Sequence, residues 1–181
     1  HAGFLRITEA LAAAGIRPTI TTGGRGITPL LARQMADAGM QRVSVSIDGL
    51  EATHDQMRAY RGSFRAATDT LDFCAAAGIV IAANSNFNRL NMAEVEGLYE
   101  HLAAHAIVAW QVQLTTPLGR AADRTDLTLQ PWDLLDLMPR LAALKTRAQA
   151  ADILMMPGNN MGYFGPEEAL LRSLEDGGKD H

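Results

Sequence analysis

The segment VSVSIDGLEATHDQMRAYRGSF, residues 43–64, decides the fold that we predict for this chain. Its first six residues alternate, with apolar side chains on one face of a strand and Ser44, Ser46 and Asp48 on the other. We expect a long polar loop after this strand, and then a helix that Ser63 caps. Because α/β proteins bind ligands at the carboxyl ends of their buried strands, Ser46 and Asp48 are the first candidates for a functional site.

Apolar runs and helical patterns alternate along the rest of the chain. The predicted strands are residues 16–22, 42–48, 79–85, 107–115 and, as a short last one, 153–156. The predicted helices are residues 1–14, 29–38, 64–77, 91–105, a long one from Pro131 that Pro139 should kink or split, and a last one from Pro166. Asn91 and Glu94 have the spacing of a capping box at the start of the fourth of these helices. Strands separated by helices of this length pair in parallel through right-handed crossovers.

Several predicted strands are polar on one face, and this pattern distinguishes a doubly wound sheet from a (β/α) barrel. A doubly wound sheet is covered by helices on both faces, so its strands are almost continuously apolar. In residues 109–115, by contrast, Gln111, Gln113 and Thr115 share one face, and Asn84 lies on a polar face of the preceding strand. We therefore predict an α/β fold with a partial (β/α) barrel of parallel strands, whose polar faces converge on a cavity.

Length, charge and cysteine content limit the function further. With 181 residues, of which 48% are apolar, the chain can bury one substantial core, so we expect one domain or most of one. The net charge of −4 argues against a nucleic-acid partner, and no apolar run approaches the roughly 20 residues that span a bilayer. The single cysteine, Cys74, excludes an intrachain disulfide and fits a reducing compartment. The chain starts at His1 and enters a helical pattern at once, so we expect it to be a piece of a longer protein.

Two polar stretches at strand ends each have two interpretations. TTGG, residues 21–24, can let the backbone approach a ligand closely, with the helix after Thr28 facing an anion, or it can be a plain turn. Asp48 can hold ribose hydroxyls or an ammonium group, or it can cap backbone amides in a turn with Gly49.

The charged segment after Asp48 has the same ambiguity. Arg58 can clamp a carboxylate through two parallel hydrogen bonds, or it can form an internal ion pair with Asp55. His101 and His105 are four residues apart, but the glutamate of an HExxH site is missing, so we expect a structural or surface role for them. For Cys74, in the middle of a predicted helix, we expect the role of a small buried apolar residue.

The order of these motifs resembles a known family. TTGG at a strand end, SIDG, HDxxR followed by GSF, and PLGRA resemble the radical S-adenosylmethionine (radical SAM) enzymes over roughly residues 1–122, with closest similarity to the branch that carries a SPASM or twitch extension. The resemblance implies about four βα units of a six-unit barrel. Residues 1–150 would form the barrel part, without its first two strands, and residues 151–181 would be a strand, loop and helix that lead toward a C-terminal extension.

The resemblance also implies an activity and its cofactors. Such enzymes hold a 4Fe–4S cluster through three cysteines, and the cluster binds S-adenosylmethionine (AdoMet) and cleaves it reductively. The resulting 5′-deoxyadenosyl radical abstracts a hydrogen atom from the substrate. The full-length protein would use AdoMet and the cluster in the cytoplasm to modify a peptide or protein, or to mature a cofactor. This chain has none of the cluster cysteines and would be inactive alone.

The resemblance assigns AdoMet-binding roles to residues at strand ends, and no catalytic residue or metal ligand. The implied residues are Thr22, Ser46 against the carboxylate, its neighbour Asp48, Arg58, Asn84, and Leu114, whose backbone would meet adenine. Arg120 of PLGR would serve either the substrate or the fold. We expect Thr22, Ser46 and Asn84 to face one common mouth.

Two other functions stay open. The chain can belong to another (β/α)-barrel or nucleotide-binding enzyme that uses TTGG for phosphate, although no GxGxxG or GxxxxGK[ST] motif is present. It can also be a non-catalytic scaffold that keeps the barrel without the cluster. In any of these, the outer edge of the first strand would be unpaired, which favours dimerisation through that edge.

Overall fold

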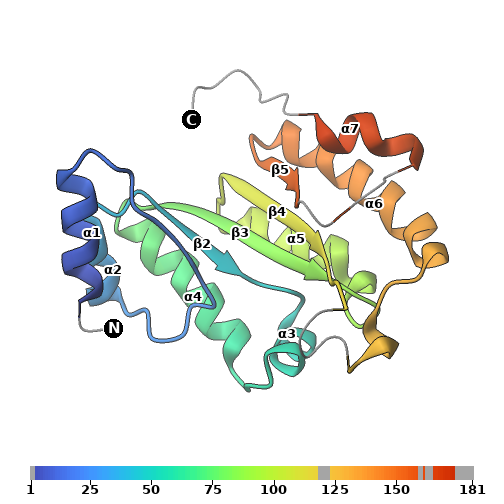
Figure 1. The fold of residues 1–181 in the computed structure, drawn as a ribbon, viewed down its shortest axis with the longest axis horizontal. Helices are drawn as coiled ribbons and strands as arrows, with labels where there is room; N and C mark the ends of the chain where they lie inside the picture. The colour runs from blue at the N-terminus through green and yellow to red at the C-terminus, as the bar shows by residue number, and fades with distance from the viewer. Residues whose placement is uncertain (1–2, 118–122, 159–160, 162–164, 174–181) are drawn as a thin grey trace.

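The structure, a computed structural model, describes residues 3–117, 123–158, 161 and 165–173 and contains one parallel sheet. The strands follow one another across the sheet in chain order: β1 (Thr19–Thr22), β2 (Arg42–Ser46), β3 (Val80–Phe87), β4 (Ala109–Leu114) and β5 (Leu154–Pro157). All four pairings are parallel (Figure 1). The predicted α/β fold of parallel strands is confirmed, including the short last strand.

Helices occupy every connection between these strands. The α-helices are α1 (Phe4–Ala13), α2 (Pro29–Asp37), α3 (Glu51–Arg58), α4 (Ser63–Ala76), α5 (Val95–Ala104), α6 (Pro131–Ala150) and α7 (Glu168–Arg172). The short 3-10 helices are η1 (Met92–Glu94), η3 (Thr125–Leu127) and η4 (Gly165–Glu167). We predicted that Pro139 would kink or split the helix from Pro131. α6 runs through Pro139 as one helix, so the proline does not split it, and a kink stays a prediction. Since Leu137, Met138 and Leu141 around the proline are buried, packing offsets the lost backbone hydrogen bond.

The long polar loop predicted after β2 is also wrong, because α3 occupies most of it. The segment EATHDQMR contains no glycine or proline, and it places Glu51 in the first turn and Arg58 in the last, where each charge suits the helix dipole. The start of α3 is bonded to a residue far along the chain. Glu94 accepts hydrogen bonds from the Leu50 N–H (2.8 Å) and the Thr53 hydroxyl (2.6 Å).

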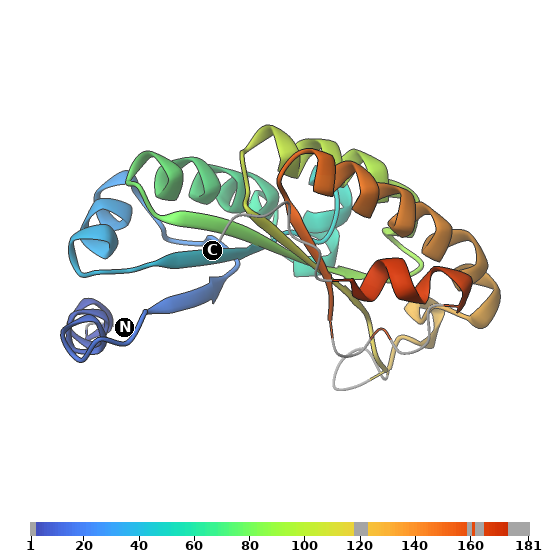
Figure 2. The same ribbon diagram turned by 90° about the horizontal axis from the view of Figure 1, so that it is seen from above.

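The helices α2, α4, α5 and α6 lie along one side of the curved sheet, which is its outer face (Figure 2). The strands bury their apolar side chains on this side, among them Val43, Val45 and Ile81. Trp110 is completely buried there, and its indole N–H donates to the Ser85 hydroxyl at 2.9 Å. This layer is the hydrophobic core, and it holds the strands in a fixed register.

The opposite, inner face of the sheet is polar. Alternation along the strands and the register between them place these side chains on it: Thr19, Thr21, Arg42, Ser44, Ser46, Ala82, Asn84, Asn86, Gln111, Gln113 and Met156. None of the described helices that connect the strands covers this face (Figure 2). The inner face is therefore the surface on which a ligand can contact several strands at once.

A buried lysine joins the last elements to the sheet. Lys145 of α6 donates hydrogen bonds from Nζ to the carbonyl oxygens of Met155 (3.0 Å), Leu171 (3.1 Å) and Ser173 (2.6 Å). These bonds link α6, β5 and the end of α7. No described helix is long and apolar enough to cross a membrane.

Candidate functional site

A cavity of about 920 Å³ lies at the carboxyl ends of β2, β3 and β4, and we call it the carboxyl-end cavity. Its lining combines ionic, carboxamide, hydroxyl and apolar side chains: Asp48, Gln56, Met57, Arg58, Ala59, Asn86, Asn88, Leu90, Gln113, Leu114, Thr115, Thr116, Arg124 and Leu127. Its position agrees with the general rule that ligands of parallel α/β proteins bind outside the carboxyl ends of the strands.

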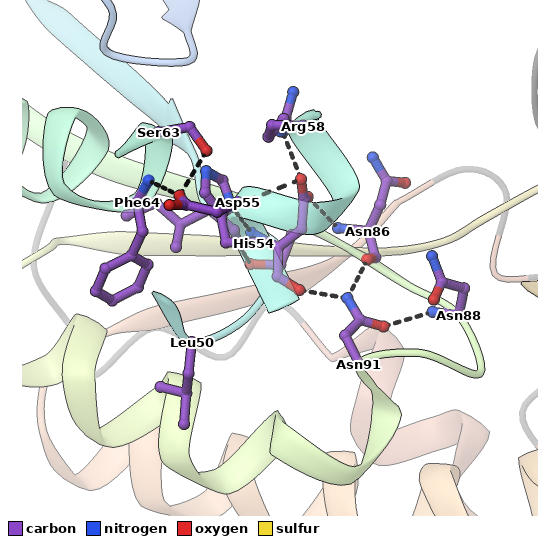
Figure 3. A network of polar contacts seen from close by, with 12 residues as sticks. Leu50, His54, Asp55, Arg58, Ser63, Phe64, Asn86, Asn88 and Asn91 are labelled. Atoms are coloured by element: carbon purple, nitrogen blue, oxygen red, sulfur yellow. Dashed lines mark hydrogen bonds and ion pairs between the residues drawn. The ribbon is translucent and has the colours of Figure 1, made fainter. Parts of the chain in front are cut away.

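Asp48 is the centre of a hydrogen-bond network beside this cavity. Figure 3 shows its partners His54, Arg58, Asn86 and Asn91. The residue is buried, and its carboxylate accepts the Asn86 N–H at 3.0 Å and pairs with Arg58 Nη2 at 2.6 Å. The carboxylate thus joins β3 to the end of α3. The Arg58 side chain is 36% exposed and lines the cavity, so its remaining N–H groups can reach a ligand.

His54 fixes the backbone of Asp48. The Asp48 N–H donates to His54 Nδ1 at 3.0 Å, so the neutral imidazole carries its proton on Nε2. Burial lowers the pKa of His54, the nearby Asp48 carboxylate partly counteracts this shift, and the Arg58 charge adds to it. Nε2 is buried with no hydrogen-bond partner among the described residues, and the ring meets Phe64 edge-on at 6.1 Å. His54 is therefore a neutral hydrogen-bond acceptor in this structure.

Asn91 completes the network from the segment after β3. Its amide group donates to the carbonyl oxygens of Asp48 and Asn86, and its side-chain oxygen accepts the Asn88 N–H at 2.7 Å. The predicted capping box of Asn91 and Glu94 is wrong. Asn91 makes no side-chain cap at its own helix, and Glu94 binds the start of α3 instead.

Asp55 does not pair with Arg58. Its carboxylate accepts the N–H groups of Gly62 (2.5 Å) and Phe64 (2.8 Å) and the Ser63 hydroxyl (2.9 Å). The backbone hydrogen bond from Phe64 contributes most to lowering the pKa of Asp55. Asp55 thus caps α4 from a neighbouring helix, and Ser63, predicted to be the cap, is the first residue of the helix.

The structure separates the six predicted binding residues into three groups. Asp48, Arg58 and Leu114 line the carboxyl-end cavity. Ser46 and Asn84 are register partners on the inner face, and Asn84 lines a second cavity nearer the amino ends of the strands. Whether any of these residues binds AdoMet stays a prediction.

Thr22 does not face the mouth that we expected it to share with Ser46 and Asn84. Its register partner is Val45, whose side chain lies on the outer face, and the Thr22 hydroxyl accepts the Gly24 N–H at 3.1 Å. The inward-facing threonine is Thr21, one residue earlier. The difference arises because adjacent strand residues point to opposite faces, so a shift of one position reverses the assignment.

Packing explains the second glycine of TTGG. Gly24 has a φ of +82°, and a Cβ atom there would come within 2.6 Å of the Ala66 carbonyl oxygen on α4. Its own carbonyl oxygen accepts the Thr70 hydroxyl at 3.0 Å. The turn interpretation therefore accounts for Gly24.

Some polar cavity residues were not among the predicted binding residues. Asn88, Gln113 and Thr115 line the cavity, as does Asn86 beyond the predicted end of its strand. The alternation of polar residues along β3 and β4 was the available signal, because it put Asn86 on one face with Asn84 and put Gln113 and Thr115 on the polar face of the next strand. The acceptor role of His54 had no signal, because it depends on a contact across a turn.

The remaining candidates behave as structural residues. Cys74 is buried, and burial raises the pKa of its thiol. His101 contacts the Thr68 hydroxyl at 3.1 Å, and His105 lies 3.7 Å from Asp72. No cluster of three potential metal ligands exists among the described residues. The segment with Arg120 lies outside the described residues.

Comparison with known proteins supports the family resemblance, although no family model matches the chain. The AdoMet-dependent heme synthase of Nitratidesulfovibrio vulgaris is 34% identical over 113 residues, which make up 62% of this chain and 31% of that protein. The PqqA peptide cyclase of Rhizobium meliloti is 27% identical over 98 residues, which make up 54% of this chain and 26% of that protein. The crystal structure of Streptococcus suis SuiB bound to S-adenosylmethionine matches with a TM-score of 0.70 and 13% identity, over 90% of this chain and 38% of SuiB.

The resemblance to radical SAM enzymes is confirmed.

The structural match shows that the curved sheet has a fold similar to part of SuiB. The chain spans about a third of the length of the curated relatives that it matches.

Proposed function

We propose that this chain forms part of the barrel of a radical SAM enzyme and that AdoMet binds in the carboxyl-end cavity. The observation that carries the proposal is the ordered group of Asp48, Arg58 and Asn86 at the wall of this cavity. The cavity volume of about 920 Å³ is sufficient for a nucleoside-sized ligand.

The cavity residues suit the parts of AdoMet. Arg58 offers N–H groups to a carboxylate. Ser46 is the last residue of β2 and lies on the inner face of the sheet. The amides of Asn86 and Gln113 can bond adenine or ribose, while Leu90 and Leu127 supply apolar surface for the ring. When bound and reduced, AdoMet supplies a 5′-deoxyadenosyl radical that abstracts a hydrogen atom from the substrate.

The 4Fe–4S cluster does not fit the residues of this chain. Cys74 is the single cysteine in the sequence, and it is buried in α4. A 4Fe–4S cluster needs several thiolates, and burial disfavours the thiolate of Cys74. We propose that the cluster ligands come from outside this sequence, and that the chain alone does not cleave AdoMet.

The substrate is proposed by class. The relatives include a heme synthase and a peptide cyclase, so the full-length enzyme would modify a peptide or protein, or mature a cofactor, in the cytoplasm. Residues 1–150 would be its barrel part, and residues 151–181 would lead toward a SPASM or twitch extension. The outer edge of β1 has no partner strand among the described residues, and it would pair with the rest of the barrel or with a second copy.

Substitutions of Ser46 and Arg58 test the binding assignment. In the intact enzyme, Ser46→Ala and Arg58→Ala should each weaken AdoMet binding by about 1.5–3 kcal/mol, the value of a hydrogen bond to a charged group. Isothermal titration calorimetry measures the dissociation constants. Arg61→Ala, which removes an exposed arginine three residues after Arg58, should leave the affinity unchanged. Unchanged affinity in both of the first two variants would place the AdoMet carboxylate elsewhere.

A further inference from the structure

We infer that Arg42 is the centre of a second ligand site on the inner face, which binds a carboxylate group of the substrate. The site lies at the amino ends of the strands, where a separate cavity of about 210 Å³ opens on this face. Arg42 is the first residue of β2, so its backbone belongs to the rigid sheet.

Arg42 differs from every other described arginine. Most of them form an ion pair with an acidic residue or, like Arg25, stack on an aromatic ring. The described arginines with no such partner are Arg6, Arg17, Arg33, Arg42 and Arg61. The other four are exposed, whereas Arg42 is half-buried. A guanidinium that is withdrawn from water without a counter-charge is unfavourable unless a ligand supplies one.

The residues around Arg42 are polar and uncommitted. Five neutral polar side chains line the same cavity: Thr19, Thr21, Ser44, Asn84 and Gln111. None of the five makes a side-chain hydrogen bond with another described residue. The register places Thr19 beside Arg42 and Thr21 beside Ser44, so these hydroxyl-bearing residues share the inner face with Arg42.

The composition of the cavity favours an organic carboxylate. Arg42 is the single charged residue in the lining, and its planar guanidinium matches the two oxygens of a carboxylate. A phosphate dianion would lack a second cation in this lining. Apolar surface from Ala82, Ala109 and Met156 can contact the carbon body of the ligand.

The position of the site relates it to the substrate, a step that rests on the proposed function. Arg42 and Asp48 are six residues apart on one extended segment, which corresponds to about 20 Å. If AdoMet occupies the carboxyl-end cavity, a molecule held by Arg42 lies along the inner face with its other end toward AdoMet. The substrate would thus be anchored by its carboxylate at the end of the barrel away from the reacting atoms.

Nuclear magnetic resonance titration of the full chain tests the site without a cluster or AdoMet. Butyrate is the probe, and butyramide is its neutral control of nearly the same shape. Butyrate should cause saturable shifts in the side-chain amide signals of Asn84 and Gln111, at about tenfold lower concentration than butyramide. Inorganic phosphate should bind more weakly than butyrate.

Variants of Arg42 complete the test. Arg42→Gln should weaken butyrate binding about tenfold or more, Arg42→Lys should keep part of the affinity, and Arg33→Gln, at an exposed arginine, should change nothing. If Arg42→Gln does not fold, two comparisons still test the site. One compares butyrate with butyramide in the unsubstituted chain, and the other compares butyrate binding in Arg42→Lys with that in Arg33→Gln. Equal shifts from butyrate and butyramide, or unchanged butyrate binding in Arg42→Lys and Arg42→Gln, would overturn the inference. A failure of AdoMet to bind at Arg58 would leave these shifts unaffected, so the two proposals can fail separately.

Discussion

At the carboxyl end of the sheet, Asp48, His54 and Asn91 are buried, and their side chains bond backbone groups of the network and Arg58. In the second cavity, toward the amino ends of the strands, Arg42 and Asn84 are half-buried, and their side chains form no hydrogen bond with another described residue. The first arrangement fixes the positions of polar side chains before a ligand binds. The second leaves hydrogen-bonding side chains without a partner among the described residues, so a ligand can bond them. Substitutions within the buried network should therefore lower stability, whereas substitutions of Arg42 and Asn84 should leave stability almost unchanged.

The largest expected difference is between two asparagines. Asn91→Ala removes three hydrogen bonds and leaves the Asp48 and Asn86 carbonyl groups without this partner, so it should lower the free energy of unfolding by about 3 kcal/mol. Asn84→Ala should change it by less than about 0.5 kcal/mol, because no side-chain bond is lost. Urea unfolding followed by circular dichroism measures both. Similar losses in the two variants would show that the two ends do not differ in this way.

The sequence predicted the barrel strands because alternation and helix spacing are local patterns. The order of the motifs also predicted Asp48 and Arg58 as binding residues, and both line the carboxyl-end cavity. The contacts that organise this wall were not predictable from local sequence. Glu94 caps α3 from more than 40 residues away, and the Asp55 carboxylate caps a different helix from its own. Such partners are set by tertiary packing, which also stabilised α3 where a loop was expected.

Substitutions of His54 should have an intermediate effect on stability, and they test the role of its Nδ1 atom. Asparagine places its side-chain oxygen near the position of Nδ1, whereas glutamine reaches toward Nε2. His54→Asn should therefore keep the bond to the Asp48 N–H, and His54→Gln should lose it, so His54→Gln should be less stable by about 1 kcal/mol. Urea unfolding at pH 7.5 makes the comparison. If His54→Asn is the less stable variant, the imidazole acts by filling space.

The same residue predicts a pH dependence. Burial holds the pKa of His54 in the folded chain below the ordinary value of 6.5, so below that pH the unfolded chain binds a proton that the folded chain does not. Stability should be level above pH 6.5 and should fall as the pH decreases below it. The pKa of His101 is also lowered by burial, so His101→Asn measures how much of the pH dependence of stability comes from His101. His54→Asn should reduce the loss of unfolding free energy between pH 7.5 and pH 5.5, and an undiminished loss would assign that dependence to other groups.

The smallest expected effect concerns two alanines with left-handed backbone. Ala59, with φ of +51°, lines the carboxyl-end cavity next to Arg58, and Ala106, with φ of +53°, precedes β4 at the amino end of the sheet. Glycine removes the strain of this conformation, about 1 kcal/mol, but adds entropy to the unfolded chain, so each substitution should stabilise by about 0.5 kcal/mol. Ala75→Gly, at an exposed position in α4, should instead destabilise by about 1 kcal/mol. Equal gains at Ala59 and Ala106 would make the strain a property of tight turns at either end. A loss at Ala59 alone would mean that its methyl group supports the Arg58 side of the cavity, and the carboxyl end would then be ordered by packing as well as by hydrogen bonds.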